Sequence, residues 1–390
     1  MRTKQMTRVA FLQYGDFAET FHRRAEGLAE TYRDQWRSDD FIADIAEHGH
    51  VTIYCLKGES AEHPLTDRLT VVHLPLAGTD DAGTVARILA DRPDILICRT
   101  PHRPVLEAAR KAGIPTLPIF ADLFERGGLR SRLRHFRLAR ALSGPNVVCV
   151  GNHNLNASRS LVRAVGVAPD RVVPWDWSRL PLAETPKVPP SDGLSIFYAG
   201  NLSETKGVGD LLHALARLRA SGVPATLALA GGGDTEFWKR LADNLRLEAE
   251  AVRFLGRISH REVAGHMRSC DVVVVPSRPA YPEGLPNTIY EALAARGPLV
   301  MSDHPAFAGR LEPDRQCLVF RAGDPADLAG ALQRLATDPA LFARLAGSAE
   351  AALDDLYFGT EWIELVSLYL SDPQNRTGWV AARSLAALKT

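Results

Sequence analysis

The sequence predicts an α/β protein built from two doubly wound domains that face each other across a cleft. Three observations carry this prediction: a length of 390 residues, an alternation of short apolar runs with longer amphipathic runs, and a restart of that alternation after a proline-rich stretch. A chain of this length exceeds one small core and fits two domains of ordinary size. Strands that alternate with helices favour parallel sheets covered on both faces.

In the first half, short apolar runs predict strands at Val9–Gln13, Val51–Leu56, Leu69–Leu74, Ile95–Cys98, Thr116–Phe120 and Val147–Val150. Amphipathic runs between them predict helices at Asp40–His48, Ala82–Ala90 and Pro104–Ala112. The last of these runs is followed by Gly-Ile-Pro, which is typical of a helix end.

After Pro181–Pro190, which has the composition of a linker, the pattern restarts. Strands are predicted at Leu194–Tyr198, Thr226–Ala230, Val252–Leu255, Val272–Val275, Leu299–Met301 and Leu318–Phe320, and helices at Gly209–Ala220, Thr235–Leu245, His260–Arg268, Thr288–Ala295 and Pro325–Ala336. We therefore expect an N-terminal domain over residues 1–180 and a C-terminal domain over 190–357, with a hinge near 175–192. A helical segment over 358–390, with a helix at Gly359–Leu370, is expected to cross back to the first domain.

Composition and charge narrow the class of protein. Hydrophobic residues make up 46% and charged residues 24%, and the formal net charge is zero. This is the balance of a soluble globular protein without the basic excess of a broad nucleic-acid footprint. No run approaches the length of a membrane span, and the N-terminus lacks the pattern of a signal peptide. The five cysteines show no close spacing, which favours buried, reduced thiols in a cytoplasmic protein. No histidines show metal-ligand spacing.

Two stretches of the second half carry groups that suit an anionic ligand. The first is Tyr198-Ala-Gly-Asn-Leu-Ser-Glu-Thr-Lys-Gly207, between a strand and a helix. Gly200 lets the backbone come close to a ligand, and Lys206 offers a point charge for phosphate. An ordinary strand-to-helix turn with an exposed lysine is the alternative.

The second stretch is Val272-Val-Val-Val-Pro-Ser, a loop, and then Glu283-Gly-Leu-Pro-Asn-Thr-Ile-Tyr-Glu291. Pro286 suits the first turn of a helix, and the open amides that follow, including that of Thr288, form an anion site. Glu283 and Glu291 flank this helix start, and carboxylates accept strong hydrogen bonds from sugar hydroxyls.

These stretches resemble the donor site of retaining family-4 glycosyltransferases of the GT-B fold, which has two Rossmann-like domains. Further segments agree in order: Leu227-Ala-Leu-Ala-Gly-Gly-Gly233, Arg253-Phe-Leu-Gly-Arg-Ile258, Cys270-Asp-Val-Val-Val-Val-Pro-Ser277 and Val300-Met-Ser-Asp303. The resemblance covers nearly all of residues 194–370, whereas in the first domain it is architectural.

The resemblance implies a role for each matching position. Lys206 would bind the donor diphosphate, Glu283 with the amides of Gly284 and Leu285 would hold the transferred sugar, and Glu291 would hold the ribose. Ile258 would lie near the base through its backbone, and Gly15 would let the first domain approach the phosphates. The donor would be a nucleoside diphosphate sugar, the anomeric configuration would be kept, and neither metal nor other cofactor would be needed.

Two departures from the family pattern matter. Asn201 stands where many relatives carry a phosphate-binding arginine, and Arg257, Arg278 or Arg99 is the expected replacement. Ala121 stands where many relatives carry a histidine, and Asp122 and His102 are the expected substitutes at the reacting centre, although a structural role for His102 is the alternative.

Three segments of the first half bear on acceptor binding, membrane contact and domain packing. Residues 14–39 form a long polar connection that we interpret either as part of the acceptor wall or as a short surface helix. The basic run 126–140 is either a solvated helix face or a contact with the inner face of a membrane. Trp175 and Trp177 either pack between domains or stack on a sugar.

The acceptor, whether a small molecule, a glycan or a lipid-linked group, is not predicted. Two other interpretations remain open: an epimerase or phosphorylase on the same scaffold, and a binding protein that has lost catalysis. The missing arginine and histidine favour the second of these.

Overall fold

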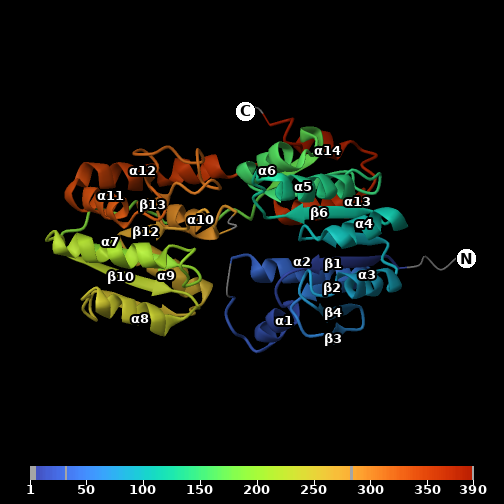
Figure 1. Ribbon diagram of the computed structural model, residues 1–390, viewed down its shortest axis with the longest axis horizontal. Coiled ribbons are helices and arrows are strands. Elements are labelled where there is room, and N and C mark those ends of the chain that lie inside the picture. The colour runs from blue at the N-terminus through green and yellow to red at the C-terminus, as the bar shows by residue number, and fades with distance from the viewer. Residues whose placement is uncertain (1–5, 31–32, 282–283, 389–390) are drawn as a thin grey trace, which may run out of the picture. The chain divides into compact units, whose positions relative to one another are not determined.

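The computed structural model, which describes residues 6–30, 33–281 and 284–388, divides the chain into two compact units (Figure 1). Unit 1 contains Met1–Glu30, Asp34–Ser178 and Phe358–Thr390, and unit 2 contains Thr31–Arg33 and Arg179–Tyr357. The C-terminal segment therefore groups with the first half of the chain, and a short piece of the first half groups with the second.

Unit 1 is built on one sheet with the strand order β3-β4-β2-β1-β5-β6-β7-β8. Its strands are β1 (Arg8–Gln13), β2 (His50–Leu56), β3 (Ala61–Thr66), β4 (Leu69–Leu74), β5 (Ile95–Cys98), β6 (Thr116–Phe120), β7 (Val150–His153) and β8 (Val172–Trp175). All neighbouring pairs are parallel except β3 and β4. Because the chain departs from β1 in both directions across the sheet, β1 and β5 form a topological switch point.

The sequence-based strands of unit 1 differ from the observed ones at three places. The two unpredicted strands, β3 and β8, lie at the edges of the sheet and contain Pro64 and Pro174. Proline removes a ladder donor, so it is confined to such edges and hides the strand pattern. The strand expected at Val147–Val150 begins at Val150, because Val147 and Cys149 are buried in the approach to the strand rather than in it.

Helices cover both faces of this sheet. They are α1 (Phe17–Ala25), α2 (Gln35–His48), α3 (Asp81–Ala90), α4 (Arg103–Ala112), α5 (Leu129–Leu142), α6 (Leu155–Ser160), α13 (Trp362–Ser371) and α14 (Trp379–Arg383). Residues of β1 alternate between the two faces: Phe11 packs with α13 on one side, and Leu12 packs with α4 on the other. This alternation is the doubly wound arrangement that the sequence predicts.

Unit 2 carries a second, wholly parallel sheet with the order β11-β10-β9-β12-β13-β14. Its strands are β9 (Leu194–Ala199), β10 (Ala225–Ala230), β11 (Val252–Gly256), β12 (Val272–Val275), β13 (Leu299–Ser302) and β14 (Leu318–Phe320). Each lies within two residues of its expected position. The switch point of this sheet lies between β9 and β12, so the loops that follow these two strands emerge side by side.

The helices of unit 2 are α7 (Val208–Ala220), α8 (Thr235–Asn244), α9 (His260–Ser269), α10 (Asn287–Ala294), α11 (Pro325–Thr337) and α12 (Pro339–Leu356). Leu211 of α7, Leu328 of α11 and Leu345 of α12 are buried in one core with Leu227 and Val274 of the sheet. Both units are therefore parallel-sheet, Rossmann-like α/β domains, as the sequence predicts.

The proline-rich stretch expected to be a linker is attached to the rest of unit 2 at Ala183 and Lys187. The half-buried Lys187 ammonium donates hydrogen bonds to the carbonyl oxygens of Met267 and Cys270, at 2.6 and 2.5 Å. Its backbone N–H donates to the Arg296 carbonyl at 3.0 Å. Burial lowers the pKa of Lys187, and the carbonyl contacts compensate part of the desolvation of its charge.

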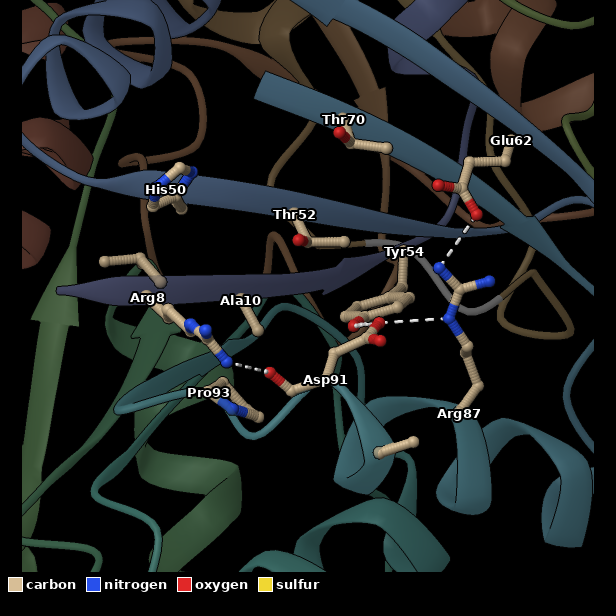
Figure 2. Close-up of a pocket in the computed structure, with 12 residues that line it drawn as sticks. Arg8, Ala10, His50, Thr52, Tyr54, Glu62, Thr70, Arg87, Asp91 and Pro93 are labelled. Carbon is tan, nitrogen blue, oxygen red and sulfur yellow. Dashed lines mark hydrogen bonds and ion pairs between the residues drawn. The ribbon is translucent and has the colours of Figure 1, made fainter. Parts of the chain in front are cut away.

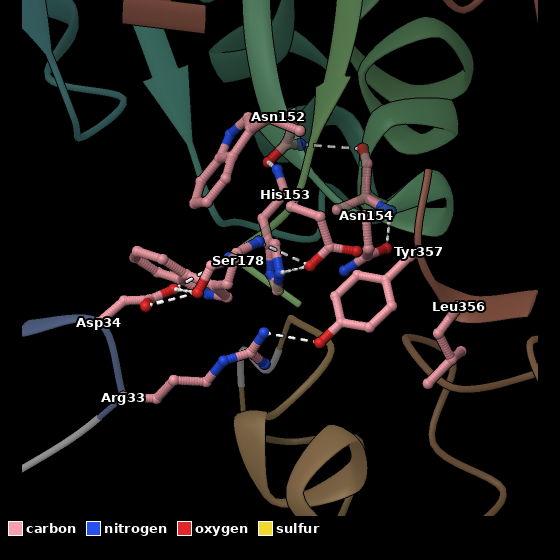
Figure 3. A network of polar contacts seen from close by, with 12 residues as sticks. Arg33, Asp34, Asn152, His153, Asn154, Ser178, Leu356 and Tyr357 are labelled. Carbon is pink, nitrogen blue, oxygen red and sulfur yellow. Dashed lines mark hydrogen bonds and ion pairs between the residues drawn. The ribbon is translucent and has the colours of Figure 1, made fainter. Parts of the chain in front are cut away.

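Two neighbouring residues, Arg33 and Asp34, belong to different units (Figure 3). Within unit 2, the buried Arg33 guanidinium donates a 2.7 Å hydrogen bond to the Tyr357 hydroxyl, which also accepts from the Leu180 amide at 3.1 Å. Within unit 1, the Asp34 carboxylate accepts from the amide and hydroxyl of Ser178 at 2.9 and 2.6 Å. The chain therefore passes from one unit to the other between Arg33 and Asp34, a point called the chain crossing below, and each of the two residues is hydrogen-bonded within its own unit.

Candidate functional site

The loops at the carboxyl end of the unit 2 sheet are tied together by backbone hydrogen bonds. The amide of Leu202, after β9, donates to the Gly232 carbonyl at 2.6 Å. The amide of Gly231, after β10, donates to the Gly256 carbonyl at 2.8 Å, and the Arg278 amide, after β12, donates to the Thr205 carbonyl at 2.8 Å. Residues predicted as ligand-binding from distant parts of the sequence therefore belong to one connected surface.

Glycine is required where these loops approach one another. A Cβ atom at Gly231 would lie 1.7 Å from the Gly200 carbonyl oxygen, and one at Gly207 would lie 2.0 Å from the Pro276 carbonyl oxygen. Both glycines have positive φ, of 148° and 74°. A side chain at either position would clash with backbone and strain the turn, so these glycines set the spacing of the loops.

Lys206 lies in the turn before α7, beside the switch point of the sheet. Its ammonium is 4.1 Å from the centre of the Tyr281 ring, in the loop after β12. The carbonyl of Tyr281 lies 3.1 Å from Nε2 of the buried His304, which stacks on Phe307. The ring of Tyr281 thus positions the Lys206 ammonium, and His304, in the loop after β13, holds Tyr281 in place. This arrangement favours a fixed cation.

Arg278 differs from its expected role as a replacement phosphate cation. Its guanidinium donates two hydrogen bonds to the buried carboxylate of Asp210, at 2.8 and 2.6 Å, and lies 2.5 Å from Glu204. These carboxylates raise the pKa of Arg278, with the Asp210 hydrogen bond as the main cause. A bidentate pair of this kind neutralises the arginine, so Arg278 anchors the loop after β12 to α7.

The other two expected replacements are also placed by the structure. Arg99, after β5 in unit 1, donates to the Gln13 side chain at 2.7 Å and lies over the Trp362 ring at 4.9 Å. Arg257 is exposed, and its guanidinium lies beside Gly232 in the loop after β10. The main-chain carbonyl of Asn201 accepts from the Tyr198 hydroxyl at 2.8 Å. Arg257 and Arg278 both lie at the sheet end that carries Lys206, and because Arg278 is paired with Asp210, Arg257 is the remaining candidate.

Helix α10 begins at Asn287, one residue earlier than the expected start at Thr288. Pro286 occupies the N-cap position with extended backbone, rather than the first turn, and no side chain among the described residues caps the helix. The amides of Asn287 and Thr288 therefore open the helix, preceded by the buried Leu285 and by Gly284. An uncapped helix start keeps its N–H groups for an anion.

Glu291 is buried in α10, and its carboxylate lies 2.9 Å from Nε2 of His260, the first residue of α9. Ile258 precedes this helix in the same loop. The pairing links the loop after β11 to the helix after β12. The other predicted carboxylate, Glu283, lies outside the described residues.

In unit 1, His102 is the N-cap of α4. Its Nδ1 accepts from the Val105 amide at 3.4 Å, and its Nε2 lies 3.1 Å from an Asp81 carboxylate oxygen. Burial lowers its pKa. These contacts are those of a structural residue: one ring nitrogen caps α4 and the other pairs with Asp81.

Asp122 and Gly15 follow β6 and β1 at the carboxyl end of the unit 1 sheet. Burial raises the pKa of the Asp122 carboxyl, and its backbone carbonyl accepts from the Asn152 side chain at 3.0 Å. Gly15 has a φ of 89° and is exposed with open space around it. Both residues remain at a sheet end suited to ligand binding.

A polar hollow of about 420 Å³ lies elsewhere in unit 1, where Arg8 and His50 begin β1 and β2 (Figure 2). Its charges pair with one another: Arg87 lies 2.9 Å from Glu62 and 3.0 Å from Asp91, which also accepts a hydrogen bond from Tyr54. It contains none of the predicted site residues and lies away from the carboxyl end, so it is not the candidate site.

Sequence reasoning missed the partners that position the predicted groups, namely Tyr281, His304, Asp210 and His260. None belongs to a motif by spacing, because each contact joins two loops. The one local signal was Ser259-x-x-Glu262, a capping box that the structure contains at the start of α9. Among the described residues, no three His, Cys, Asp or Glu side chains are grouped to hold a metal ion.

Part of the chain is similar in sequence to known proteins. Residues 193–338 match the family described as glycosyl transferases group 1. Over 181 residues the chain is 33% identical to a glycogen synthase of Mycobacterium tuberculosis, covering 46% of this chain and 42% of the relative. Over 164 residues it is 34% identical to a phosphatidyl-myo-inositol mannosyltransferase of Mycobacterium leprae, covering 42% of each. The chain thus spans less than half the length of these relatives.

Solved structures resemble nearly the whole chain. A sucrose-phosphate synthase from Thermosynechococcus elongatus aligns with a TM-score of 0.67 and 18% identity, over 96% of this chain and 100% of that one. Anabaena HepE in complex with UDP aligns with a TM-score of 0.64 and 17% identity, over 94% and 100%. At this identity the likeness concerns the fold. The chain therefore has the GT-B fold, and its residues 193–338 match the family of glycosyl transferases group 1.

Proposed function

We propose that this chain is a glycosyltransferase that moves a sugar from a nucleoside diphosphate sugar to an acceptor, with retention of anomeric configuration. The observation that carries the proposal is the end of the unit 2 sheet, where a held ammonium (Lys206), an uncapped helix start (α10) and a buried carboxylate (Glu291) lie on interlinked loops. All three lie within the segment that matches the family.

The chemistry explains why these groups belong together. Breaking the bond between the sugar and the diphosphate leaves negative charge on the leaving nucleoside diphosphate. Lys206 and the amides of Asn287 and Thr288 would stabilise that charge, and such fixed contacts are worth about 2–4 kcal/mol each in the transition state. In this proposal no metal ion is required, since the ammonium and the helix start supply the positive potential.

The remaining groups would select and orient the donor. Glu291, held by His260, would accept hydrogen bonds from the ribose hydroxyls, and the backbone at Ile258 would border the base. Glu283, with the amides of Gly284 and Leu285, would hold the transferred sugar, as the family resemblance implies. Gly200 and Asn201 would border the phosphates, with Arg257 as the additional cation.

The donor and the cellular setting are proposed more broadly. HepE has been solved in complex with UDP and with UDP-glucose, so uridine diphosphate sugars are the first donors to test. Unit 1, with Asp122 and Gly15 at its sheet end, would bind the acceptor. We place the reaction in the cytoplasm, where nucleotide sugars would be available as substrates.

The test is release of nucleoside diphosphate from a panel of nucleotide sugars, with and without candidate acceptors and with EDTA present. The Lys206→Ala and Glu291→Gln variants are expected to lower kcat/KM at least tenfold. Lys239→Ala, which removes an exposed lysine of α8, is the matched control and should keep parental turnover. Donor binding without any release in the parent chain would instead favour a binding protein that has lost catalysis. Full activity in both site variants would refute the donor site.

A further inference from the structure

Helix α5 in unit 1 exposes an apolar stripe that no described part of the chain covers. Leu129, Leu133 and Phe136 are 83%, 51% and 65% exposed. At about 100° per residue they share one side of the helix, while Leu138 and Leu142 on the opposite side are buried against unit 1. The helix is therefore anchored by one apolar face and presents a second to the surroundings.

The exposed side is also strongly basic. Arg130, Arg132, Arg134, Arg137 and Arg140 are exposed, and none of them forms an ion pair with a carboxylate in the described part of the chain. Residues 126–169 include eight arginines and no aspartate or glutamate. Although the chain as a whole carries no net charge, this region therefore has an uncompensated positive potential.

We propose that α5 is a docking surface for an anionic phospholipid membrane. On a helical projection, Arg140 falls among the three apolar side chains and Arg132 and Arg137 flank them. This arrangement would let the arginines reach lipid phosphates while Leu129, Leu133 and Phe136 enter the acyl boundary. A purely solvated face would not concentrate exposed leucine and phenylalanine, and a nucleic-acid surface would gain nothing from two leucines.

A hollow beside the stripe extends this surface. It has a volume of about 480 Å³ and is lined by α5 together with Ala164 and Val165, which end the helical segment Leu161–Val165 after α6. The helix lies flat on the unit, and its 14 residues span roughly 21 Å. Among the described residues, none of the helices has the length and hydropathy that a bilayer span requires.

The test is co-sedimentation of the full chain with vesicles of phosphatidylcholine alone, or of phosphatidylcholine with about one third phosphatidylglycerol, an anionic lipid. Binding is expected to the anionic vesicles and to fall steeply between about 0.1 and 0.5 M salt, because exposed charges are screened. Each arginine near such a surface strengthens binding about fivefold. The triple variant Arg130→Gln, Arg132→Gln, Arg137→Gln should therefore bind at least tenfold more weakly.

The apolar contribution is tested separately. Leu133→Ser with Phe136→Ser should weaken binding to anionic vesicles at least tenfold, and a Phe136→Trp variant should show blue-shifted fluorescence on the vesicles. Matched controls in unit 2 are the exposed-arginine triple Arg217→Gln, Arg240→Gln, Arg253→Gln and the exposed-aromatic variant Phe237→Ser. Both should bind like the parent, and thermal melting checks that all variants fold.

Several results would overturn the proposal: equal binding to neutral vesicles, no binding to anionic vesicles, or loss of binding in the unit 2 controls. Tighter binding to a single-stranded RNA than to vesicles, or a dimer that Phe136→Ser dissolves, would assign the surface to a different partner. Lipid binding and donor turnover are separate properties, since α5 contributes no residue to the donor site. A variant that releases nucleoside diphosphate normally but no longer binds vesicles would support the lipid role alone.

Discussion

The two units share one architecture, yet they differ at the switch points of their sheets. In unit 2, the loops after β9 and β12 meet through Lys206, Tyr281 and the Arg278–Asp210 pair. In unit 1, the corresponding loops after β1 and β5 meet through Gln13 and Arg99, near a buried carboxyl at Asp39. The fold therefore provides an equivalent ligand-binding position at the switch point of each sheet. The side chains at the switch point determine whether that position suits an anion.

The largest expected effect concerns the cation of unit 2. Lys206→Ala should reduce kcat/KM for donor turnover by roughly 30- to 1000-fold, because removing one fixed contact to developing charge costs about 2–4 kcal/mol. The melting temperature should change little, since the ammonium packs on an aromatic face at the carboxyl end of the sheet. Steady-state kinetics with a donor that the parent turns over measure this effect. Arg99→Ala, at the equivalent position of unit 1, should leave donor affinity largely intact. An equal loss of kcat/KM in Arg99→Ala would contradict the assignment of the donor site to unit 2.

The next effect concerns the ion pair that anchors the unit 2 loop. Arg278→Ala leaves the buried Asp210 carboxylate without its bidentate partner, which should lower the stability of unit 2 by about 3 kcal/mol. Thermal unfolding and hydrogen exchange in α7 would measure the loss. Adding Asp210→Asn should recover part of it. If the single variant melts like the parent, the pair contributes nothing and Arg278 is released for a role at the phosphates.

A third prediction uses the buried carboxyl of unit 1. Burial raises the pKa of Asp39 to about 7, and Arg24 and Arg99 oppose that shift only partly. Between about pH 4 and 7 the folded state therefore binds more protons than the unfolded state, so the free energy of unfolding falls as the pH rises. Asp39→Asn should stabilise unit 1 by about 1–3 kcal/mol at pH 8 and by almost nothing at pH 3. Melting curves across this range would measure the difference, and a pH-independent gap would contradict the assignment.

The smallest effect concerns the chain crossing. Tyr357→Phe removes the hydroxyl that accepts from Arg33 and from the Leu180 amide, which should cost about 1–2 kcal/mol. Faster hydrogen exchange at Leu180 is the expected sign. Tyr281→Phe removes a hydroxyl but keeps the ring under Lys206, so it is the matched control and should leave that amide unchanged.

Much of the fold could be predicted from the sequence because the signals are local. The predicted strands of unit 2 lie within two residues of those observed, since each is an apolar run bounded by turn residues. The misses have local causes as well: β3 and β8 contain proline, and the apolar run at Val147 begins three residues before β7. In the candidate site, motif spacing pointed to Lys206, Glu291 and the start of α10, and their roles remain predictions.

What only the tertiary structure decided is how these groups are held. Glu291 pairs with His260 across 31 positions of sequence, and Arg33 reaches Tyr357 across 324. No periodicity encodes such contacts, because they depend on the order of the strands and on which loops then emerge together. The sequence by itself determined the alternating elements and the chemical types at the ends of the strands. The tertiary structure decided that Arg278 is neutralised by Asp210, that His102 caps a helix, and that the apolar stripe of α5 stays exposed, because burial and pairing are properties of the packed chain.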